Sequence, residues 1–511
     1  MLRPGRLLIP ATERLFRHIE GDAEWRTAVE AIARRGPVVY VLRNVSAVDY
    51  LALEHLTQRM DLPRIGFVND LPAPFAPQNG TGGLEPAEQL RETVAAGHSA
   101  ALFVKRAPTR TSTTHRGRSE GATLLESLLA LQAAGGEREI MMMPQTFVWG
   151  GRSERLGWSL VDTIFGPADF PGELRQAAQF LANRGKCQLR AGEPLSLREF
   201  LQRQGSDQPT PALLRQLTYA LLRKVERERR TIVGPARKAP DRLREEVVQS
   251  PKLQKVIREL AGPGEGRALL TDKARVILKA MQTIPDPETA RGFEMVAETV
   301  LEHVFAGFDI DREGLERLRK VCCDGAVILL PSHRSHVDYL LISCLLLRNS
   351  IQAPAIAAGE NLSFFPAGPL LRRGGAFFIR RRVRGDRLYA AVLNAYLRRL
   401  VRDGHMIEFF LEGGRSRTGK LLPPKLGLLN MIVAAALSLN SHRIFFQPIS
   451  IGYERLMEEG AYARELSGQK KQKENAAALL GIRRVLTDRW GRVNVQFGQP
   501  FELSELRDAA G

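Results

Sequence analysis

A histidine and an aspartate stand five positions apart, at His333 and Asp338, between two apolar runs. The run 326–330 predicts a short buried strand, and the run 339–347 predicts a packed helix. Across the turn between them, the carboxylate would accept a hydrogen bond from one imidazole nitrogen and leave the other nitrogen free to act as a base. The pattern predicts general-base catalysis on a substrate hydroxyl, although a His and an Asp at this spacing also occur by chance in many chains.

Three further segments share one design, an apolar strand-like run that ends in polar or glycine residues. They are 375–381, 410–419 and 445–454. Open α/β sheets place their ligand sites at such strand ends. The segments supply guanidinium groups suited to a phosphate, and a glycine pair that lets backbone amides approach an anion. These candidate anion ligands are Arg381, Arg415, Arg417, Gly413 and Gly414.

The four blocks read HRSHVDYLL, GAFFIRR, FLEGGRSRTG and PISIGYE, in this order, over about 326–454. This wording resembles the glycerolipid acyltransferases, and within them the bacterial membrane-bound glycerol-3-phosphate acyltransferases. The related lysophosphatidate acyltransferases usually carry Glu-Gly-Thr-Arg in the third block, where this chain has Glu412-Gly413-Gly414-Arg415. The resemblance implies an α/β sheet with flanking helices and acyl transfer to glycerol 3-phosphate. Dihydroxyacetone-phosphate acyltransferases share much of the wording, so dihydroxyacetone phosphate stays the alternative acceptor.

The resemblance also implies roles for individual residues. His333 would be the base and Asp338 its orienting partner, as the chemistry of the pair also suggests. The residues that would contact the glycerol phosphate or shape the acyl-donor side are Arg381, Glu412, Gly413, Gly414, Arg415, Arg417, Ser335 and Pro448. The acceptor's C1 hydroxyl would attack a fatty-acyl thioester of coenzyme A or acyl-carrier protein through a tetrahedral oxyanion, and lysophosphatidate would result. This reaction, the first step of phospholipid synthesis, needs no metal or redox cofactor.

Each assignment has a simpler alternative. His333 and His336 could form half of a zinc site, but the other histidines of this region are isolated and Cys322 and Cys323 are adjacent, which disfavours a metal site. The arginines within 372–387 cannot all bind phosphate, so most are expected on a solvated face, with Arg381 inside. The phenylalanines of the second and third blocks are more often strand core than the lining of an acyl-chain site.

The charge favours an anionic partner. The formal net charge of the 511 residues is +18, which suits nucleic acid or an acidic membrane surface. No nucleic-acid-binding module is legible, so anionic phospholipid is the expected partner. A catalytically silent protein that binds anionic lipid is the alternative from another functional class. The intact His333 and Asp338 argue against that alternative.

Hydropathy and cysteine usage bear on location. No run approaches the roughly twenty apolar residues of a membrane-spanning helix, and the first residues have too short an apolar stretch for a secretory signal. The four cysteines, at 187, 322, 323 and 344, form no disulfide framework and suit a reducing compartment. We therefore expect a peripheral or monotopic protein on the cytoplasmic face of the inner membrane, and a homodimer among its assemblies.

The N-terminal part of the chain echoes the catalytic part. Residues 37–51 parallel 326–340, and Asn44 falls where His333 stands. Later segments follow in the same order: 102–106 echoes 377–381, 117–120 echoes 414–417, 140–144 echoes 444–448, and 192–199 echoes 498–505. Because an asparagine cannot take up and return a proton as imidazole does, this copy would be silent. An unrelated α/β domain with ordinary strand ends is the alternative.

These patterns predict three parts. The length allows more than one core, and 44% of the residues are hydrophobic. We expect a degenerate acyltransferase-like domain over 1–201, a helical linker region over 202–311, and the catalytic acyltransferase domain over 312–511. The linker is expected to be helical because leucines recur every four residues at Leu213, Leu217 and Leu221 and because glycine-proline breakers separate its segments.

Overall fold

The structure is a computed structural model of the chain. It describes residues 16–17, 19, 23–71, 84–105, 120–135, 138–149, 180, 187–205, 210–235, 238–262, 266–364, 367–380, 385–416, 420–439, 443–456 and 490–509. Contacts divide the chain into two compact units, with the main boundary between Ile232 and Val233. Each unit has a sheet and hydrophobic cores of its own.

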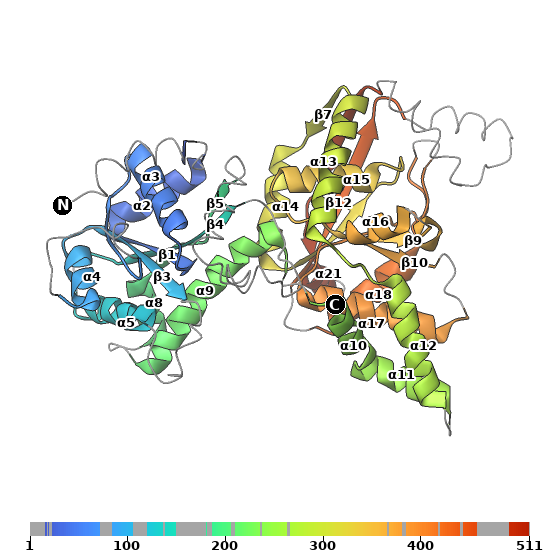
Figure 1. Ribbon diagram of the computed structural model, residues 1–511, viewed down its shortest axis with the longest axis horizontal. Coiled ribbons are helices and arrows are strands. Elements are labelled where there is room, and N and C mark those ends of the chain that lie inside the picture. The colour runs from blue at the N-terminus through green and yellow to red at the C-terminus, as the bar shows by residue number, and fades with distance from the viewer. Residues whose placement is uncertain are drawn as a thin grey trace. The chain divides into compact units, whose positions relative to one another are not determined.

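The first unit consists of a sheet and flanking helices (Figure 1). Its helices are α2 (Ala23–Arg35), α3 (Ala47–Arg59), α4 (Pro86–Ala95), α5 (Glu120–Ala133), α8 (Leu197–Gln204) and α9 (Pro211–Val233). Its strands are β1 (Val38–Asn44), β2 (Ile65–Val68), β3 (Ser99–Lys105), β4 (Met141–Trp149), β5 (Cys187–Ala191) and β6 (Leu195–Ser196). The strands lie in the order β2-β3-β1-β4-β5, and β6 pairs with β4.

Helices cover both faces of this sheet. Strand β1 pairs in parallel with β3 and β4, while β5 and β6 return antiparallel to β4. Val38 and Tyr40 of β1 lie in the core that includes α2 and α3, and Val39 and Val41 lie in the core that includes α4 and α5. Because both faces are buried, the strand reads as an unbroken apolar run rather than an alternating one.

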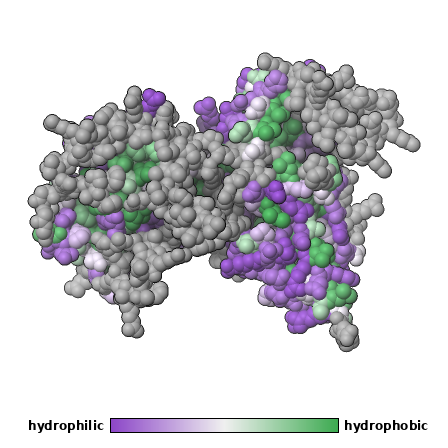
Figure 2. All heavy atoms as spheres, viewed as in Figure 1, coloured by the Kyte–Doolittle hydropathy of each residue, from purple (hydrophilic) through white to green (hydrophobic). Residues whose placement is uncertain are grey.

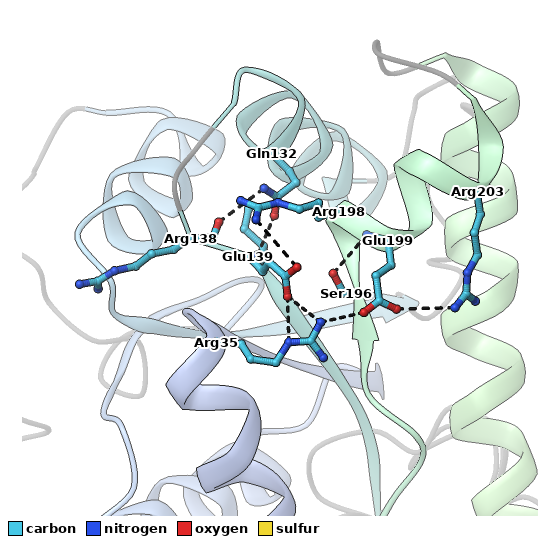
Figure 3. Close-up of polar contacts among 9 residues, drawn as sticks. Arg35, Gln132, Arg138, Glu139, Ser196, Arg198, Glu199 and Arg203 are labelled. Carbon is cyan, nitrogen blue, oxygen red and sulfur yellow. Dashed lines mark hydrogen bonds and ion pairs between the residues drawn. The ribbon is translucent and has the colours of Figure 1, made fainter.

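An ion-pair network fixes one edge of this unit (Figure 3). The guanidinium of Arg35, at the end of α2, contacts both Glu139 and Glu199, each at 2.7 Å. Glu139 precedes β4 and Glu199 lies in the first turn of α8, so one side chain joins three elements. Nearby, the side-chain oxygen of Gln132 accepts a hydrogen bond from the backbone N–H of Ile140 at 2.7 Å.

The second unit has a larger sheet (Figure 1). Its helices are α10 (Pro240–Val248), α11 (Pro251–Ala261), α12 (Gly266–Met281), α13 (Pro287–Val304), α14 (Arg312–Asp324), α15 (Asp338–Arg348), α16 (Ala367–Arg373), α17 (Arg387–Asp403), α18 (Leu426–Leu437) and α21 (Leu503–Ala509), with a 3-10 turn at Glu360–Leu362. Its strands are β7 (Gly307–Ile310), β8 (Ala326–Pro331), β9 (Ala355–Gly359), β10 (Ala376–Ile379), β11 (Ile407–Glu408), β12 (Ile444–Tyr453), β13 (Arg492–Phe497) and β14 (Phe501–Glu502).

Strand β8 lies at the centre of this sheet, in the order β10-β9-β11-β8-β12-β13-β7, and β14 pairs with β12. It runs parallel to β11 and β12, whereas β13 and β14 return antiparallel to β12. Ile328 faces the core shared with α12 and α17, and Val327 and Leu329 face the core shared with α14 and α15. The sheet thus places the carboxyl ends of β8, β11 and β12 side by side.

These observations confirm the predicted α/β fold, with sheets flanked by helices. The predicted strand over 326–330 is β8, and the predicted helix over 339–347 is α15. The region expected to link two domains is helical, but its helices join different cores. Residues of α9 pack in the first unit, whereas α10, α11 and α12 pack on α17 in the second.

The helices α10 to α12 present a largely solvated surface. In Figure 2, hydrophilic residues prevail over the region that these helices occupy in Figure 1, with scattered hydrophobic residues among them. Among the helices within the described ranges, none combines the length and the apolar character needed to span a bilayer.

The two sheets share an order of strands. The series β2-β3-β1-β4-β5, with β6 on β4, matches β9-β11-β8-β12-β13, with β14 on β12, and each corresponding pair has the same parallel or antiparallel sense. One sequence echo is wrong by this order. Residues 102–106 were matched to 377–381, but β3 pairs with β1 as β11 pairs with β8, whereas β10 pairs with β9. Of the other echoes, residues 117–119 lie outside the described residues.

Candidate functional site

The turn between β8 and α15 brings His333 and Asp338 together. Nδ1 of His333 lies 2.9 Å from Oδ2 of Asp338. With the carboxylate ionised, Nδ1 carries the proton and donates it to this hydrogen bond, so Nε2 keeps its lone pair. The histidine side chain is 17% exposed, whereas the aspartate is fully buried. The geometry suits a base that removes a proton from a hydroxyl.

Four donors surround the carboxylate of Asp338. Besides the histidine, its Oδ2 accepts hydrogen bonds from the backbone N–H groups of Arg334, at 2.6 Å, and Ser335, at 2.9 Å. Its Oδ1 accepts from the hydroxyl of Tyr453, at 2.6 Å. A buried carboxylate needs such partners to keep its charge. The turn therefore supplies a fixed negative charge beneath the imidazole.

The third block holds the backbone and the ring of His333. The backbone N–H of His333 donates to Oε1 of Glu412, and its carbonyl accepts from the backbone N–H of Ser416, both at 2.9 Å. The ring of Phe410 stacks on the imidazole, with 3.9 Å between the centroids and 18° between the planes. His333 is thus held at its backbone, at Nδ1 and over one ring face, which limits the motion of Nε2.

Glu412 acts on the backbone of two segments. It is 6% exposed, and its Oε2 accepts a hydrogen bond from the backbone N–H of Leu422 at 2.9 Å, while Oε1 accepts from His333. The sequence predicted that Glu412 contacts the glycerol phosphate. The structure instead shows both carboxylate oxygens occupied by backbone donors, which favours a positioning task for this residue.

Gly413 permits a basic side chain to cross the third block. Its φ is +57°, and a Cβ at this position would lie 2.7 Å from Cδ and 3.3 Å from Nζ of Lys425. Any larger residue would have to displace the lysine and adopt a left-handed conformation that glycine tolerates best. Gly414 is open, with no atom within 4 Å of the place a Cβ would take. With half-buried Arg415, this loop offers positive charge and close backbone approach to an anion.

The other predicted contacts are distributed differently. Ser335 is 1% exposed, and its backbone N–H serves Asp338. Pro448 is half-buried in β12 opposite Leu330, and its carbonyl accepts from the backbone N–H of Gly498 at 3.0 Å. Two further predicted contacts, Arg381 and Arg417, lie outside the described residues. The roles assigned to all of these residues stay predictions.

The described ranges contain no group of three or more His, Cys, Asp or Glu side chains placed to hold a metal ion. The half-site considered for His333 and His336 therefore gains no third ligand within these ranges.

The chain is similar to known acyltransferases. Residues 309–452 match the acyltransferase family model, residues 21–234 match the glycerol-3-phosphate acyltransferase PlsB N-terminal domain, and residues 462–511 match the glycerol-3-phosphate acyltransferase C-terminal region. The chain is also 32% identical, over 481 residues and 92% of its length, to a glycerol-3-phosphate acyltransferase of Aeromonas hydrophila. Three separate parts of the chain are thus similar to acyltransferase or glycerol-3-phosphate acyltransferase domains.

Other relatives have the same name. Proteins from Xanthomonas campestris and Shewanella frigidimarina are each 32% identical over 92% of this chain. The chain spans about half the length of the curated relatives it matches: 55% of the Aeromonas protein, 51% of the Xanthomonas protein and 55% of the Shewanella protein. A solved 1-acyl-sn-glycerophosphate acyltransferase from Thermotoga maritima aligns with 53% of this chain and 92% of its own, at 18% identity and a TM-score of 0.28, a value too low to support any argument.

Sequence reasoning missed several residues of this candidate site. Tyr453 and Phe410 lie inside the four sequence blocks. A polar or aromatic residue at a strand end is the pattern that could have indicated them as site residues. Lys425 follows the third block by several residues, and only the folding of the chain brings it over Gly413. Glu408 was also missed, although the sequence contains a signal for it. It is a charged residue within the apolar stretch 406–411, and a charge is costly to bury, so its presence there indicates a functional or specially placed acid.

Glu408 is a buried acid near Asp338. It lies on β11, it is fully buried, and neither of its carboxylate oxygens has a hydrogen-bond partner among the described residues. Burial, together with the nearby charge of Asp338, raises the pKa of Glu408 well above its ordinary value. This shift favours the protonated form of Glu408.

This pKa shift predicts a pH-dependent change in stability for Glu408→Gln. Below the unfolded-state pKa of about 4.3, both states hold the proton and the two proteins should differ little. As the pH rises through that value toward the folded-state pKa, wild type must retain a proton that the unfolded chain releases. Its free energy of unfolding then falls by about 1.4 kcal/mol per pH unit relative to the variant. Thermal unfolding from acidic to alkaline pH measures the difference.

Glu502→Gln provides the control with the opposite sign. The ion pair with Arg443 lowers the pKa of Glu502, so wild type gains stability above that pKa and loses it on acidification. The deficit of Glu502→Gln should therefore shrink as the pH falls. A difference between wild type and Glu408→Gln that does not change with pH would show that Glu408 takes up no proton on folding.

The first unit contains a counterpart of the aspartate contact. The indole N–H of Trp149 donates to Oδ1 of Asp49 at 2.6 Å, as the hydroxyl of Tyr453 donates to Oδ1 of Asp338. Asp49 lies in the first turn of α3, and Asn44 ends β1 before it. Burial raises the pKa of Asp49 to about 7.

Proposed function

We propose that the protein transfers a fatty acyl group from an acyl thioester to the C1 hydroxyl of glycerol 3-phosphate, which yields lysophosphatidate. The observation that carries the proposal is the restraint on His333, whose ring and backbone are fixed by Asp338, Glu412 and Ser416. The names of the relatives support this acceptor, because each is called a glycerol-3-phosphate acyltransferase.

In the proposed reaction, Nε2 of His333 removes the proton of the C1 hydroxyl as the oxygen attacks the thioester carbonyl. A carbon–oxygen bond forms and a tetrahedral oxyanion results. The oxyanion collapses, the carbon–sulfur bond breaks, and the imidazolium returns its proton to the leaving thiolate. The charge of Asp338 stabilises the imidazolium between the two proton transfers, and proton transfer by a positioned base contributes roughly a hundredfold to ten-thousandfold in rate.

The third block would bind the phosphate of the acceptor. Arg415 and the Lys425 ammonium stand beside Gly413 and Gly414, where backbone amides can approach an oxyanion. Arg381 and Arg417 remain proposed ligands of the same phosphate. The donor would be acyl-coenzyme A or acyl-carrier protein, and both are acidic enough to suit the net charge of +18. Pro448 would shape the donor side.

The test is acyl transfer from labelled palmitoyl thioester in lipid vesicles, with glycerol 3-phosphate and dihydroxyacetone phosphate offered in parallel. We expect transfer to glycerol 3-phosphate with a kcat/KM at least about tenfold higher, because a site that hydrogen-bonds a hydroxyl discriminates against an analogue lacking it. A preference for dihydroxyacetone phosphate would replace the acceptor but keep the chemistry. No transfer from either thioester to either acceptor, together with salt-sensitive vesicle binding, would favour a non-catalytic lipid-binding protein.

The proposed location is the cytoplasmic face of the inner membrane, with the protein bound peripherally or monotopically to anionic phospholipid. A fatty acyl group and an acylated product are both poorly soluble in water. An enzyme at the bilayer surface does not have to move them through water. A homodimer remains part of the proposal, and the first unit would be available to form its surface.

We also propose that residues 1–201 are a degenerate copy of the catalytic domain at 312–511, with 202–311 as the helical region between them. The registers support this. Val41 of β1 pairs with Pro144 of β4, and Leu330 of β8 pairs with Pro448 of β12. The carbonyl of Pro144 accepts from the N–H of Gly192 at 2.8 Å, as that of Pro448 accepts from Gly498.

A close approach at the start of each sheet supports the same relation. A Cβ at Gly36 would lie 2.0 Å from the carbonyl oxygen of Glu139, and one at Gly325 would lie 2.1 Å from that of Arg443. Each glycine precedes the central strand of its sheet. The absence of a side chain at each glycine allows the equivalent segment of neighbouring backbone to approach closely.

The remnant of the catalytic pair is the strongest support for duplication. Asp49 and Trp149 stand where Asp338 and Tyr453 stand, with the same 2.6 Å contact, while Asn44 replaces the base. Since an amide does not take up a proton near neutral pH, this unit would hold no chemistry of its own.

A further inference from the structure

The segment that follows the third block exposes leucines next to the active site. We call Lys420–Leu437 the rim segment, which comprises the loop 420–425 and helix α18. Every residue from 420 to 427 is exposed, and three of them are leucines. Leu421 is 71% exposed, Leu426 50% and Leu422 37%. Such a cluster of large apolar side chains on a surface usually marks a site of interaction.

The loop that carries Leu421 and Leu422 has a fixed backbone. The N–H of Leu422 donates to Oε2 of Glu412 at 2.9 Å, and the N–H of Lys425 donates to the carbonyl of Leu411 at 2.7 Å. The hydroxyl of Ser416 donates to the carbonyl of Lys420. The two intervening residues are prolines, which restrict φ. The leucines are therefore held outward by a formed structure.

Helix α18 continues the apolar surface. Its twelve residues include no charged side chain. Ile432, Ala435 and Ala436 face the core, whereas the exposed positions recur at helical spacing and form one stripe. This stripe consists of Leu426, Gly427, Asn430, Ala434 and Leu437. A surface helix ordinarily has charged residues on its outer face. An uncharged outer stripe therefore indicates a face that contacts a partner rather than solvent.

The charge of the rim segment selects the kind of partner. The segment contains two lysines, Lys420 and Lys425, and no aspartate or glutamate. Both lysines are exposed and stand at the two ends of the leucine-bearing loop. Apolar side chains next to Lys420 match the boundary of an anionic bilayer, where leucines enter the acyl region and the Lys420 ammonium reaches the headgroup phosphates. The Lys425 ammonium instead lies beside Gly413, in the proposed acceptor site.

We propose that the rim segment docks the second unit on an anionic phospholipid bilayer. The proposal rests on the proposed function, because a fatty acyl group gives the enzyme a reason to work at a bilayer. Glu412 connects the rim segment with the proposed active site. One of its carboxylate oxygens accepts from the backbone N–H of Leu422, and the other accepts from the backbone N–H of His333. Docking would place His333 near the bilayer surface, where the acylated product can enter the lipid.

The test is sedimentation of the full chain with two kinds of vesicle, phosphatidylcholine alone and phosphatidylcholine with phosphatidylglycerol. Wild type is compared with the double variant Leu421→Ser/Leu426→Ser and with Leu269→Ser, a leucine on α12 that is 58% exposed. Removal of each rim leucine should weaken binding to the anionic vesicles roughly tenfold, so the double variant loses about a hundredfold. Leu269→Ser should bind like wild type, and thermal unfolding should show all three proteins folded.

The outcomes separate this proposal from the proposed function. Equal binding by the double variant and wild type overturns docking through the rim segment, whatever the enzyme activity. Weaker transfer from acyl-carrier protein in solution, with unchanged vesicle binding, also overturns it and makes the segment a protein-binding surface. Leucine-dependent binding by a wild type that transfers no acyl group in vesicles or detergent supports docking and removes the proposed function.

Discussion

Replacing His333 with alanine is expected to lower kcat for acyl transfer to glycerol 3-phosphate by roughly a hundredfold to ten-thousandfold. In the proposed reaction the imidazole takes the hydroxyl proton through Nε2, because its Nδ1 is hydrogen-bonded to Asp338. KM should change little, because in the proposed reaction the ring of His333 acts on the hydroxyl and the third block binds the phosphate. Initial rates with labelled palmitoyl thioester, at varied glycerol 3-phosphate, measure kcat and KM separately.

The matched control is Asn44→Ala in the first unit. Asn44 stands at the corresponding strand end, so the substitution removes a comparable polar group from the proposed silent copy. It should leave kcat within about threefold of wild type, an effect of well under 1 kcal/mol on the barrier. Loss of activity in Asn44→Ala as deep as that in His333→Ala, with both proteins folded, would contradict a silent copy. An active His333→Ala would remove this histidine from the chemistry.

Local sequence patterns predicted the parts of the site that are local in the chain. His333 and Asp338 are joined by one turn, and the apolar runs on either side are the strand and helix that form it. The spacing of residues was enough to predict this turn, because a parallel strand buried on both faces and a packed helix each have an unbroken apolar sequence.

Contacts between distant segments could not be read in this way. Glu412 serves a backbone N–H 79 residues away, and Tyr453 reaches Asp338 across 115 residues. Such contacts depend on which strands become neighbours, and that order follows from packing of the whole sheet. The same cause explains the mistaken echo of residues 102–106, since similar apolar strands differ in sheet position and not in composition.

Replacing Asp338 with asparagine is expected to lower kcat by roughly a hundredfold to a thousandfold. Two backbone N–H groups point at the Oδ2 position, so the amide oxygen should take that place and still accept from Nδ1 of His333. The tautomer of the base then survives and only the negative charge is lost. A charge about 4 Å from the imidazolium, at an effective dielectric constant near 20, contributes about 4 kcal/mol, which sets the upper end of the expected loss.

Two further variants determine whether charge or placement is the cause. Tyr453→Phe removes one donor from Oδ1 but keeps the charge, so kcat should stay within about tenfold of wild type. Asp338→Ala removes the charge and also the carboxylate oxygen that accepts from the backbone N–H groups of Arg334 and Ser335, so it should lose both activity and thermal stability. If Asp338→Asn instead retained wild-type kcat, the aspartate would serve only to shape the turn, and the stabilisation of the imidazolium would have to come from another group.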